Sequence, residues 1–409
     1  MTELDGAPLP IPEPGQAGAE AFVADHLSHV VSGPTVGSPA IRGGQTAADA
    51  ALASFDVAGY ASRRNEVYPQ HRRGASKLSP YIRHGLLSLP QVWAASDDGP
   101  ARDVQKFHDE LLWQEFARHW YARLGRTTSQ GIRRSLPPMA TSGSEPFDMT
   151  MACMAATVGE LETDGWLVNQ TRMWLSSHWA IRQGHAWQDG EDYFFRHLLD
   201  GSRAANRLGW QWTTGVGSSK HYGFSRWQVN KRAAGLCDSC VHRSDCPIED
   251  WPSDPAFAPA RRSSVMPEAD PTVVAGPRSA VRFESADAVW LTAESLALDD
   301  PALAAHPDLP VLFVFDEPLL TTLQLSAKRL VFLTETLAEL ATERDLTLLL
   351  GDPVELLQDH RLSVTFAPVP GFRSRADALG PVDVQPWPWL RQPSTGSVNS
   401  FSAWRKSVR

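Results

Sequence analysis

The chain has 409 residues, of which 42% are hydrophobic and 21% charged, as expected for a globular protein with one or two domains. No apolar run approaches the roughly 18 residues that a membrane span needs, and no signal peptide is evident, so we expect a cytoplasmic protein without a membrane partner. The net charge of −9 does not exclude a nucleic-acid partner, because a local basic patch can dominate a mildly acidic total.

The sequence predicts four segments in chain order. Residues 1–40 contain the Pro/Gly-rich stretch PLPIPEPGQAGAE and are expected to form a flexible leader. Residues 41–253 are dominated by helical spacing, as in VQKFHDELLWQEFARHWYARLG, which stops at Gly125. A Pro/Ala/Ser-rich linker, 254–279, follows. In residues 280–409, short apolar strands alternate with amphipathic helices, which predicts a parallel sheet with helices on both faces.

Three of the four cysteines lie close together, as Cys237-x2-Cys240-x5-Cys246, whereas Cys153 lies far upstream. Two cysteines separated by two residues can point at one metal, and a third a few residues later completes one face of a site. Thiolates suit both zinc and iron–sulfur clusters. A set of buried free thiols is the simpler alternative, and the spacing alone does not separate zinc from iron–sulfur.

Residues 42–252 resemble the FAD-binding domain of the DNA photolyase/cryptochrome family. The motifs that carry the resemblance follow family order: GASKLSPYIRHGLLSLPQVW, ELLWQEF, DGWLVNQTRMW, AWQDGEDYF and LLDGSRAANRLGWQW. Residues 280–409 resemble the antenna domain of that family, which normally comes first. The resemblance therefore implies a circular permutation, with an all-helical FAD-binding domain followed by a small Rossmann-like doubly wound parallel α/β domain. Such a permutation is physically permissible, because surface linkers can be cut and joined without disturbing a core.

The resemblance also implies cofactors. FAD is the first, and an antenna chromophore of unidentified chemistry is another candidate. The segment CDSCVHRSDCPIEDWP resembles the closing motif of the iron–sulfur branch of bacterial cryptochromes and photolyases. That branch implies a [4Fe-4S] cluster with these ligands: Cys153, Cys237, Cys240 and Cys246.

Motif positions in the family imply roles for eight residues around the flavin. Those for the diphosphate and ribityl region are Tyr60, Ser76, Leu78 and Ser79. Those for the isoalloxazine ring are Asn169, Arg172, Asp200 and Asn206. Arg172 and Asp200 are expected to pair beside the ring, where positive charge stabilises anionic reduced flavin. Without the motif, each serine would be read as a helix cap and each charged residue as part of a solvated face.

Trp210 and Trp187 match the inner two members of the family's photoreduction chain. Closely spaced aromatic rings allow an electron to hop towards the surface. No tryptophan lies between Trp120 and Trp166, so the outer member is not found. Core packing is the alternative role for both residues.

Four residues match contacts to a cyclobutane pyrimidine dimer in the family: Glu110, Trp113, Met173 and Trp212. A dimer flipped out of DNA needs aromatic walls for stacking and a carboxyl group for the thymine edge. The pocket also departs from the family, which has Arg, His, Arg and Asp at the positions of Gln114, Val168, Gln170 and Ser202. The missing histidine at position 168 argues against repair of (6-4) lesions, which relies on a histidine acid.

We therefore expect light-driven splitting of cyclobutane pyrimidine dimers by electron transfer from excited reduced FAD. The expected protein is a monomeric photolyase with UV-damaged DNA as partner, single-stranded DNA included. The altered pocket favours an alternative, a cryptochrome-like blue-light photoreceptor without repair activity. A third reading is a flavin/iron–sulfur redox protein that merely binds DNA, for which the segment GSSKHYGFSRWQVNKRAAG supplies basic residues.

Overall fold

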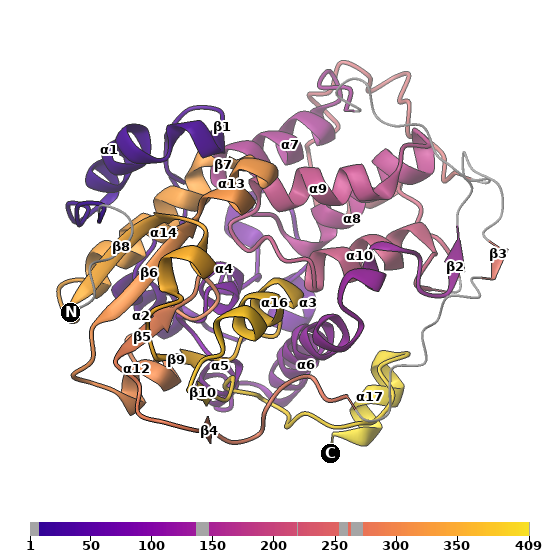
Figure 1. Ribbon diagram of the computed structural model, residues 1–409. Helices are drawn as coiled ribbons and strands as arrows, with labels where there is room; N and C mark the ends of the chain where they lie inside the picture. Colours follow the sequence, from indigo (N-terminus) through magenta and orange to yellow (C-terminus); the bar gives the residue numbers. More distant parts are fainter. Residues whose placement is uncertain (1–7, 136–146, 219, 253–260, 263–272, 409) are drawn as a thin grey trace.

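Helices form the first part of the chain and a six-stranded sheet the second, in a computed structural model (Figure 1). The residues that the structure describes are 8–135, 147–218, 220–252, 261–262 and 273–408. In the first part the helices are α2 (Gln45–Ser54), α3 (Tyr60–Arg63), α4 (Ser79–Arg83), α5 (Leu89–Ala95), α6 (Ala101–Leu124), α7 (Ala152–Asp164), α8 (Asn169–Ser177), the π-helix η4 (His178–Arg182), α9 (Trp187–His197), α10 (Ala205–Thr214) and α11 (Arg226–Arg232).

The longest helix, α6, has 24 residues and carries the motif ELLWQEF. Its buried residues Phe107 and Leu111 share one face, because residues four apart are neighbours on a helix, whereas Trp120 packs into a different apolar cluster. The helix ends at Gly125, whose φ of 56° lies in the left-handed region that glycine adopts without a steric penalty. The predicted helix and its end at this glycine are confirmed.

The first parallel strand of the sheet is a central one, and the later parallel strands lie on both sides of it. The strand order is β4-β10-β9-β5-β6-β8, so the first parallel strand, β5, lies between β9 and β6. All pairs are parallel except that of β10 with β4. The strands are β4 (Val281–Arg282), β5 (Ala288–Leu291), β6 (Val311–Asp316), β8 (Leu346–Gly351), β9 (Leu362–Thr365) and β10 (Asp383–Gln385). The predicted parallel sheet is thus confirmed, with one antiparallel edge strand that makes it mixed.

Successive residues of the central strands point to opposite faces of the sheet. On β6, Phe313 and Phe315 belong to one core cluster, whereas Leu312 and Val314 belong to another. The first cluster contains residues of α14 and the second contains Phe372 of α16, so helices cover both faces. The helices of this part are α12 (Pro301–Ala305), α13 (Glu317–Leu323), α14 (Ala327–Leu340), α15 (Pro353–Leu357), α16 (Pro370–Leu379) and α17 (Phe401–Ser407).

The segment expected to be a flexible leader contains a packed helix. Helix α1 (Gln16–His26) lies against α14, and its Phe22 contacts Phe315 with ring centroids 6.0 Å apart. Strand β1 (Val31–Ser32) pairs in parallel with β7 (Leu325–Ser326). The leader prediction is therefore wrong for residues 16–32. The segment AEAFVADHLSHVV follows the Pro/Gly-rich start, and its apolar residues bury against the sheet half.

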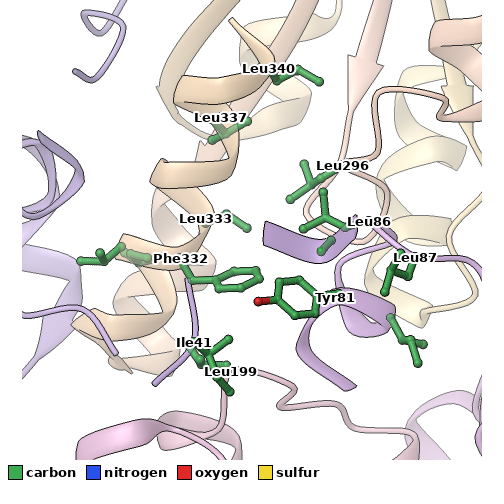
Figure 2. Packing of buried hydrophobic residues seen from close by; sticks show 14 of the residues in the cluster. Ile41, Tyr81, Leu86, Leu87, Leu199, Leu296, Phe332, Leu333, Leu337 and Leu340 are labelled. Carbon is green, nitrogen blue, oxygen red and sulfur yellow. The ribbon is translucent and has the colours of Figure 1, made fainter. Parts of the chain in front are cut away.

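The helical part and the sheet part share one apolar core. Figure 2 shows Tyr81 of α4 beside Phe332 of α14, with Leu86 and Leu296 above them, and the two rings lie 5.9 Å apart. Burial of this surface contributes roughly 25 cal/mol per Å² of apolar area. Most of the predicted linker 254–279 and residues 1–7 lie outside the described residues. Within the described part of the chain, no helix is long and apolar enough to cross a membrane.

Candidate functional site

Arg172, near the start of α8, joins two polar residues from the next part of the chain. Its guanidinium donates to Asp200 Oδ2 at 2.6 Å and to Asn206 Oδ1 at 3.0 Å. Its Nε donates to the carbonyl of Leu167 at 3.1 Å. The expected ion pair of Arg172 and Asp200 is therefore present. We call Arg172, Asp200 and Asn206 the Arg172 cluster.

Two buried atoms of the Arg172 cluster have no hydrogen-bond partner among the described residues. They are Asp200 Oδ1, an acceptor, and Asn206 Nδ2, a donor. Leaving a buried polar atom unpaired costs about 1–3 kcal/mol, so native proteins rarely keep such atoms without a use. An adjacent donor and acceptor fit the polar edge of a flavin ring, which carries N–H, ring nitrogen and carbonyl groups. The residues present therefore fit this cofactor.

The loop that carries Asp200 is fixed from both parts of the molecule. The carbonyl of Gly201 accepts from Arg83 Nε at 2.9 Å and from Arg329 at 3.2 Å. Arg329 lies on α14 of the sheet part, and burial lowers its pKa to about 9, with a further contribution from Arg83. The sequence prediction missed this role of Arg329. A charged residue on the buried side of an amphipathic helix was the signal that could have revealed it.

The residues expected near the flavin diphosphate lie on α3 and at the start of α4. Ser79 Oγ accepts from Trp166 Nε1 at 3.1 Å, and Ser76 Oγ accepts from the backbone N–H of Leu78 at 3.4 Å. Tyr60 is buried, and this burial raises its pKa, with a smaller contribution from Glu110. The side chain of Leu78 is fully buried in the core, so only its backbone could contact a ligand.

Asn169 is the first residue of α8 and is exposed. It lies three residues before Arg172, so both belong to neighbouring positions on one helix face. The structure gives it no hydrogen bond to the Arg172 cluster among the bonds of the described residues. Its contact with a flavin stays a prediction.

Glu110 and Trp113, expected at the lesion, lie three residues apart on α6. Glu110 Oε1 is 2.8 Å from Lys106 Nζ and 3.4 Å from Arg64 Nε, so its charge is balanced by two cations. Trp113 is 39% exposed and stacks on Phe401 of α17, with centroids 4.0 Å apart and an interplanar angle of 10°. One face of the indole is thus covered.

Trp212 and Met173, the other two expected lesion contacts, lie on α10 and α8, which pack together. Trp212 is 46% exposed, and its ring contacts Tyr222 at 5.8 Å. The hydroxyl of Tyr222 accepts from Gln170 Nε2 at 2.8 Å. Met173 is half-buried. Trp113 and Trp212 therefore have different aromatic partners, and the structure does not bring their rings into contact.

The two expected electron-transfer tryptophans are both buried. Trp210 packs against Gly190 of α9 and contacts Phe194 and Trp179, with centroids 5.1 and 6.3 Å away. Trp187 lies in the same apolar cluster but makes no ring contact with any residue that the structure describes. Trp179 was not among the expected residues, because the quoted family motifs do not contain it.

The basic segment that follows α10 is partly neutralised. Arg226 pairs with Glu249 at 2.8 Å and Arg232 with Glu66 at 3.1 Å. Lys231 lies over the exposed ring of Trp227, at 4.5 Å from its centroid. A lysine beside an exposed aromatic ring can bind a phosphate and a base together.

All four cysteines line one pocket, and none forms a disulfide. Burial raises the pKa of the Cys153 thiol to about 12, and the nearby Cys237, Cys246 and Cys240 raise it further. Across the described ranges, no three His, Cys, Asp or Glu side chains converge closely enough to hold a single metal ion. Thiolate sulfurs are donors for zinc and for iron–sulfur clusters, so the donor set fits either kind of site.

Part of the helical region is similar in sequence to known proteins. Residues 107–234 match the sequence model of the family described as the FAD binding domain of DNA photolyase. The deoxyribodipyrimidine photo-lyase of a Synechococcus species is 29% identical over 199 residues, which cover 43% of this chain and 40% of that protein. The deoxyribodipyrimidine photo-lyase of Thermus thermophilus is 29% identical over 223 residues, with 52% and 50% covered.

A crystal structure of a bacterial class III photolyase from Agrobacterium tumefaciens aligns with 21% identity and a TM-score of 0.40, and the alignment covers 54% of this chain and 46% of that one. The chain thus spans about half, or less, of the length of the curated relatives described above. Over the segment that contains the Arg172 cluster, the chain is similar to the FAD-binding domain of DNA photolyases.

Proposed function

We propose that this protein is a light-driven DNA-repair enzyme that splits cyclobutane pyrimidine dimers by electron transfer from excited reduced FAD. The observation that carries the proposal is the Arg172 cluster, with its two unpaired buried atoms, inside the segment that matches a FAD-binding family. When bound, FAD supplies the light-driven one-electron chemistry that amino-acid side chains lack.

The chain's own residues bind and orient the flavin. Arg172 places a positive charge where reduced flavin carries negative charge, and Asp200 holds that guanidinium in position. Asn206 Nδ2 and Asp200 Oδ1 would hydrogen-bond to the ring edge. The diphosphate and ribityl chain would be held by Tyr60, Ser76, Ser79, Asn169 and the backbone of Leu78.

The exposed tryptophans supply a binding surface for a flipped dimer in UV-damaged DNA, double- or single-stranded. Trp113 keeps one ring face free for stacking because Phe401 covers only the other. Trp212 is more exposed still. Glu110 would hydrogen-bond the thymine edge, and Met173 would fill the space beside the dimer. Base stacking on an aromatic side chain contributes about 1–3 kcal/mol per base.

We further propose a [4Fe-4S] cluster on Cys153, Cys237, Cys240 and Cys246. The pocket lined by all four cysteines supports this ligand set. The cluster would join α7 to the segment after α11 and so stabilise the helical part.

The domain arrangement belongs to the same proposal. An all-helical FAD-binding domain, 41–253, precedes a Rossmann-like antenna-type domain, 280–409, as a circular permutation of the family order. The protein would act as a monomer, and the sheet domain offers a place for an antenna chromophore.

A cryptochrome-like photoreceptor is the second candidate, and one observation favours it. Gln170, where the family has arginine, is buried and bonded to Tyr222, so no cation at this position lies beside Trp212. Fewer cations near the lesion pocket would weaken binding to the phosphate backbone of DNA.

The test illuminates the reduced protein with blue light in the presence of oligonucleotides that carry one cyclobutane dimer. Chromatography measures restored thymines, with dark controls, on single- and double-stranded DNA. We expect Glu110→Gln to lower the repair rate by about 10- to 100-fold, since a charge-assisted hydrogen bond is lost. The matched control is Glu343→Gln at an exposed position. If the protein binds FAD but splits no dimer on either DNA form, the repair proposal fails and the photoreceptor takes its place.

A further inference from the structure

We infer that electrons reach the flavin site from Tyr193 through Trp179 and Trp210, and that Glu162 accepts the phenolic proton of Tyr193. This inference rests on the proposed function because it presupposes bound FAD. It names a route for electrons from the surface to the flavin site that the sequence motifs did not reveal. The three rings and the carboxylate come from α10, η4, α9 and α7.

The inner end of the route lies beside the Arg172 cluster. Asn206 and Trp210 are four residues apart on α10, so their side chains share one helix face. Trp210 is pressed closely onto α9, because a Cβ at Gly190 would lie only 2.2 Å from its ring. The ring is therefore held rigidly, one helical turn from the asparagine expected to contact the flavin.

The middle of the route is Trp179. Its ring lies 6.3 Å from Trp210 in an edge-to-face arrangement and 6.0 Å from Tyr193, with an interplanar angle of 25°. Trp179 belongs to the π-helix η4, a type of local distortion that often occurs at functional sites. Its Nε1 donates to the carbonyl of Ala186 at 2.9 Å, which fixes the ring orientation.

The outer end of the route is built to release a proton. Tyr193 is half-buried, and its hydroxyl donates to Glu162 Oε1 at 2.7 Å. Glu162 is exposed on α7. A phenol loses its proton when it is oxidised, so a carboxylate already hydrogen-bonded to the hydroxyl can take that proton without any rearrangement.

The expected second member of the family chain does not offer the same contact. Trp187 makes no ring contact within the described part of the chain, whereas Trp179 touches both Trp210 and Tyr193. Ring contact favours fast hopping, so Trp179 is the better partner of Trp210. Both tryptophans lie in the same apolar cluster, and variants of each can decide between them.

The steps balance for one electron and one proton. Light drives one electron from Trp210 to the flavin site. Trp179 then donates an electron to the oxidised Trp210, and Tyr193 donates one to the oxidised Trp179. The phenolic proton moves to Glu162, which leaves a neutral tyrosyl radical at the surface. A thiol reductant in solution restores the tyrosine by donating one hydrogen atom and becomes a thiyl radical, and Glu162 releases its proton to water.

The experiment illuminates the protein with oxidised FAD bound and without added reductant, and records electron paramagnetic resonance spectra. We expect a tyrosyl signal that narrows when tyrosine is ring-deuterated. Trp179→Phe and Tyr193→Phe should abolish it, and Glu162→Gln should reduce its yield because the proton acceptor is lost. Tyr68→Phe, at an exposed tyrosine outside the route, is the matched control and should keep the full signal.

The outcomes separate this inference from the proposed function. Dimer splitting by chemically reduced protein is measured in parallel, because that assay bypasses the route. A tyrosyl signal without repair supports the route and sinks the repair proposal. If Trp187→Phe removes the radical while Trp179→Phe and Tyr193→Phe keep it, the route is overturned. Glu162→Gln leaves every ring in place, so an unchanged yield in that variant counts against the proton step even if a ring variant fails to fold.

Discussion

The Arg172 cluster and the cysteine pocket hold their side chains in different ways. In the Arg172 cluster, each residue is fixed by hydrogen bonds of 2.6–3.1 Å to another protein group. In the cysteine pocket, Cys240 Sγ accepts a hydrogen bond from the backbone N–H of Ala152 at 3.5 Å, and Cys237 has a side-chain hydrogen bond with Arg226. Three of its cysteines also lie outside helices and strands. The first site is therefore held by hydrogen bonds within the protein, whereas under our proposal the four cysteines are held by the [4Fe-4S] cluster that they would bind.

The largest expected effect comes from removing one cysteine ligand of the proposed [4Fe-4S] cluster. Cys237→Ser should abolish iron and sulfide binding and lower the free energy of unfolding by several kcal/mol, because ligand binding to a metal contributes directly to folding. Hydrogen exchange should increase in residues 233–252, while FAD binding persists. The control is Ser239→Ala in the same turn segment. Loss of FAD together with the iron would contradict the independence of the two sites.

Acid should destabilise the segment beside the Arg172 cluster, because His84 becomes protonated. Burial lowers the pKa of this histidine from 6.5 to about 3, with further contributions from Arg83 and Arg329. The unfolded chain therefore binds a proton more readily, and the protein loses up to about 5 kcal/mol of stability as pH falls from 6.5 towards 3. His84 Nε2 is 3.2 Å from the carbonyl of Leu199, which precedes Asp200, so FAD release should accompany the loss.

Urea unfolding at several pH values between 7 and 4 measures this slope. His84→Gln should flatten it relative to the original protein. His197 contributes in the same direction, because burial lowers its pKa to about 4, so only the difference between the two proteins isolates His84. Equal slopes would show that His84 does not carry the effect.

Breaking the Arg172 cluster should cost somewhat less. Arg172→Ala leaves Asp200 buried without its cation, and removing one partner of a buried ion pair costs about 3–5 kcal/mol. FAD binding should be lost while iron is retained. The control is Arg361→Ala, whose exposed pair with Asp287 contributes at most about 1 kcal/mol. Calorimetry and cofactor analysis check both, and loss of iron in Arg172→Ala would contradict the comparison.

The smallest expected changes in stability come from two glycine variants. Gly190→Ala should destabilise the protein by about 1–3 kcal/mol and shift tryptophan fluorescence, because the new methyl group overlaps Trp210. Gly159→Ala, on α7, meets no atom within 4 Å and should stabilise the helix by up to about 1 kcal/mol. Equal effects in the two variants would show that the contact with Trp210 is loose.

The sequence predicted those features that depend on neighbouring residues or on a known motif. The end of α6 at Gly125 and the strands of the parallel sheet follow from apolar spacing and turn residues. The ion pair of Arg172 and Asp200 followed from motif position, and the structure contains it. These features depend on neighbouring residues or on a motif with a known order.

Long-range packing was beyond such reasoning. The burial of α1 against α14, the contact of Arg329 with Gly201 and the stacking of Trp113 on Phe401 join segments far apart in the chain. The pattern within either segment does not reveal its partner. The ring contacts of Trp179 were hidden for the same reason, since the tryptophan lies outside every quoted motif.

The packing of α1 has a consequence for the protein during synthesis. Helix α1 ends at residue 26 and its partner α14 begins at residue 327, so the partner is translated roughly 300 residues later. At about 5–20 residues per second, the apolar face of α1 waits roughly 15 to 60 s on the ribosome-bound chain. Throughout that interval the exposed apolar face of α1 is a natural binding site for a chaperone.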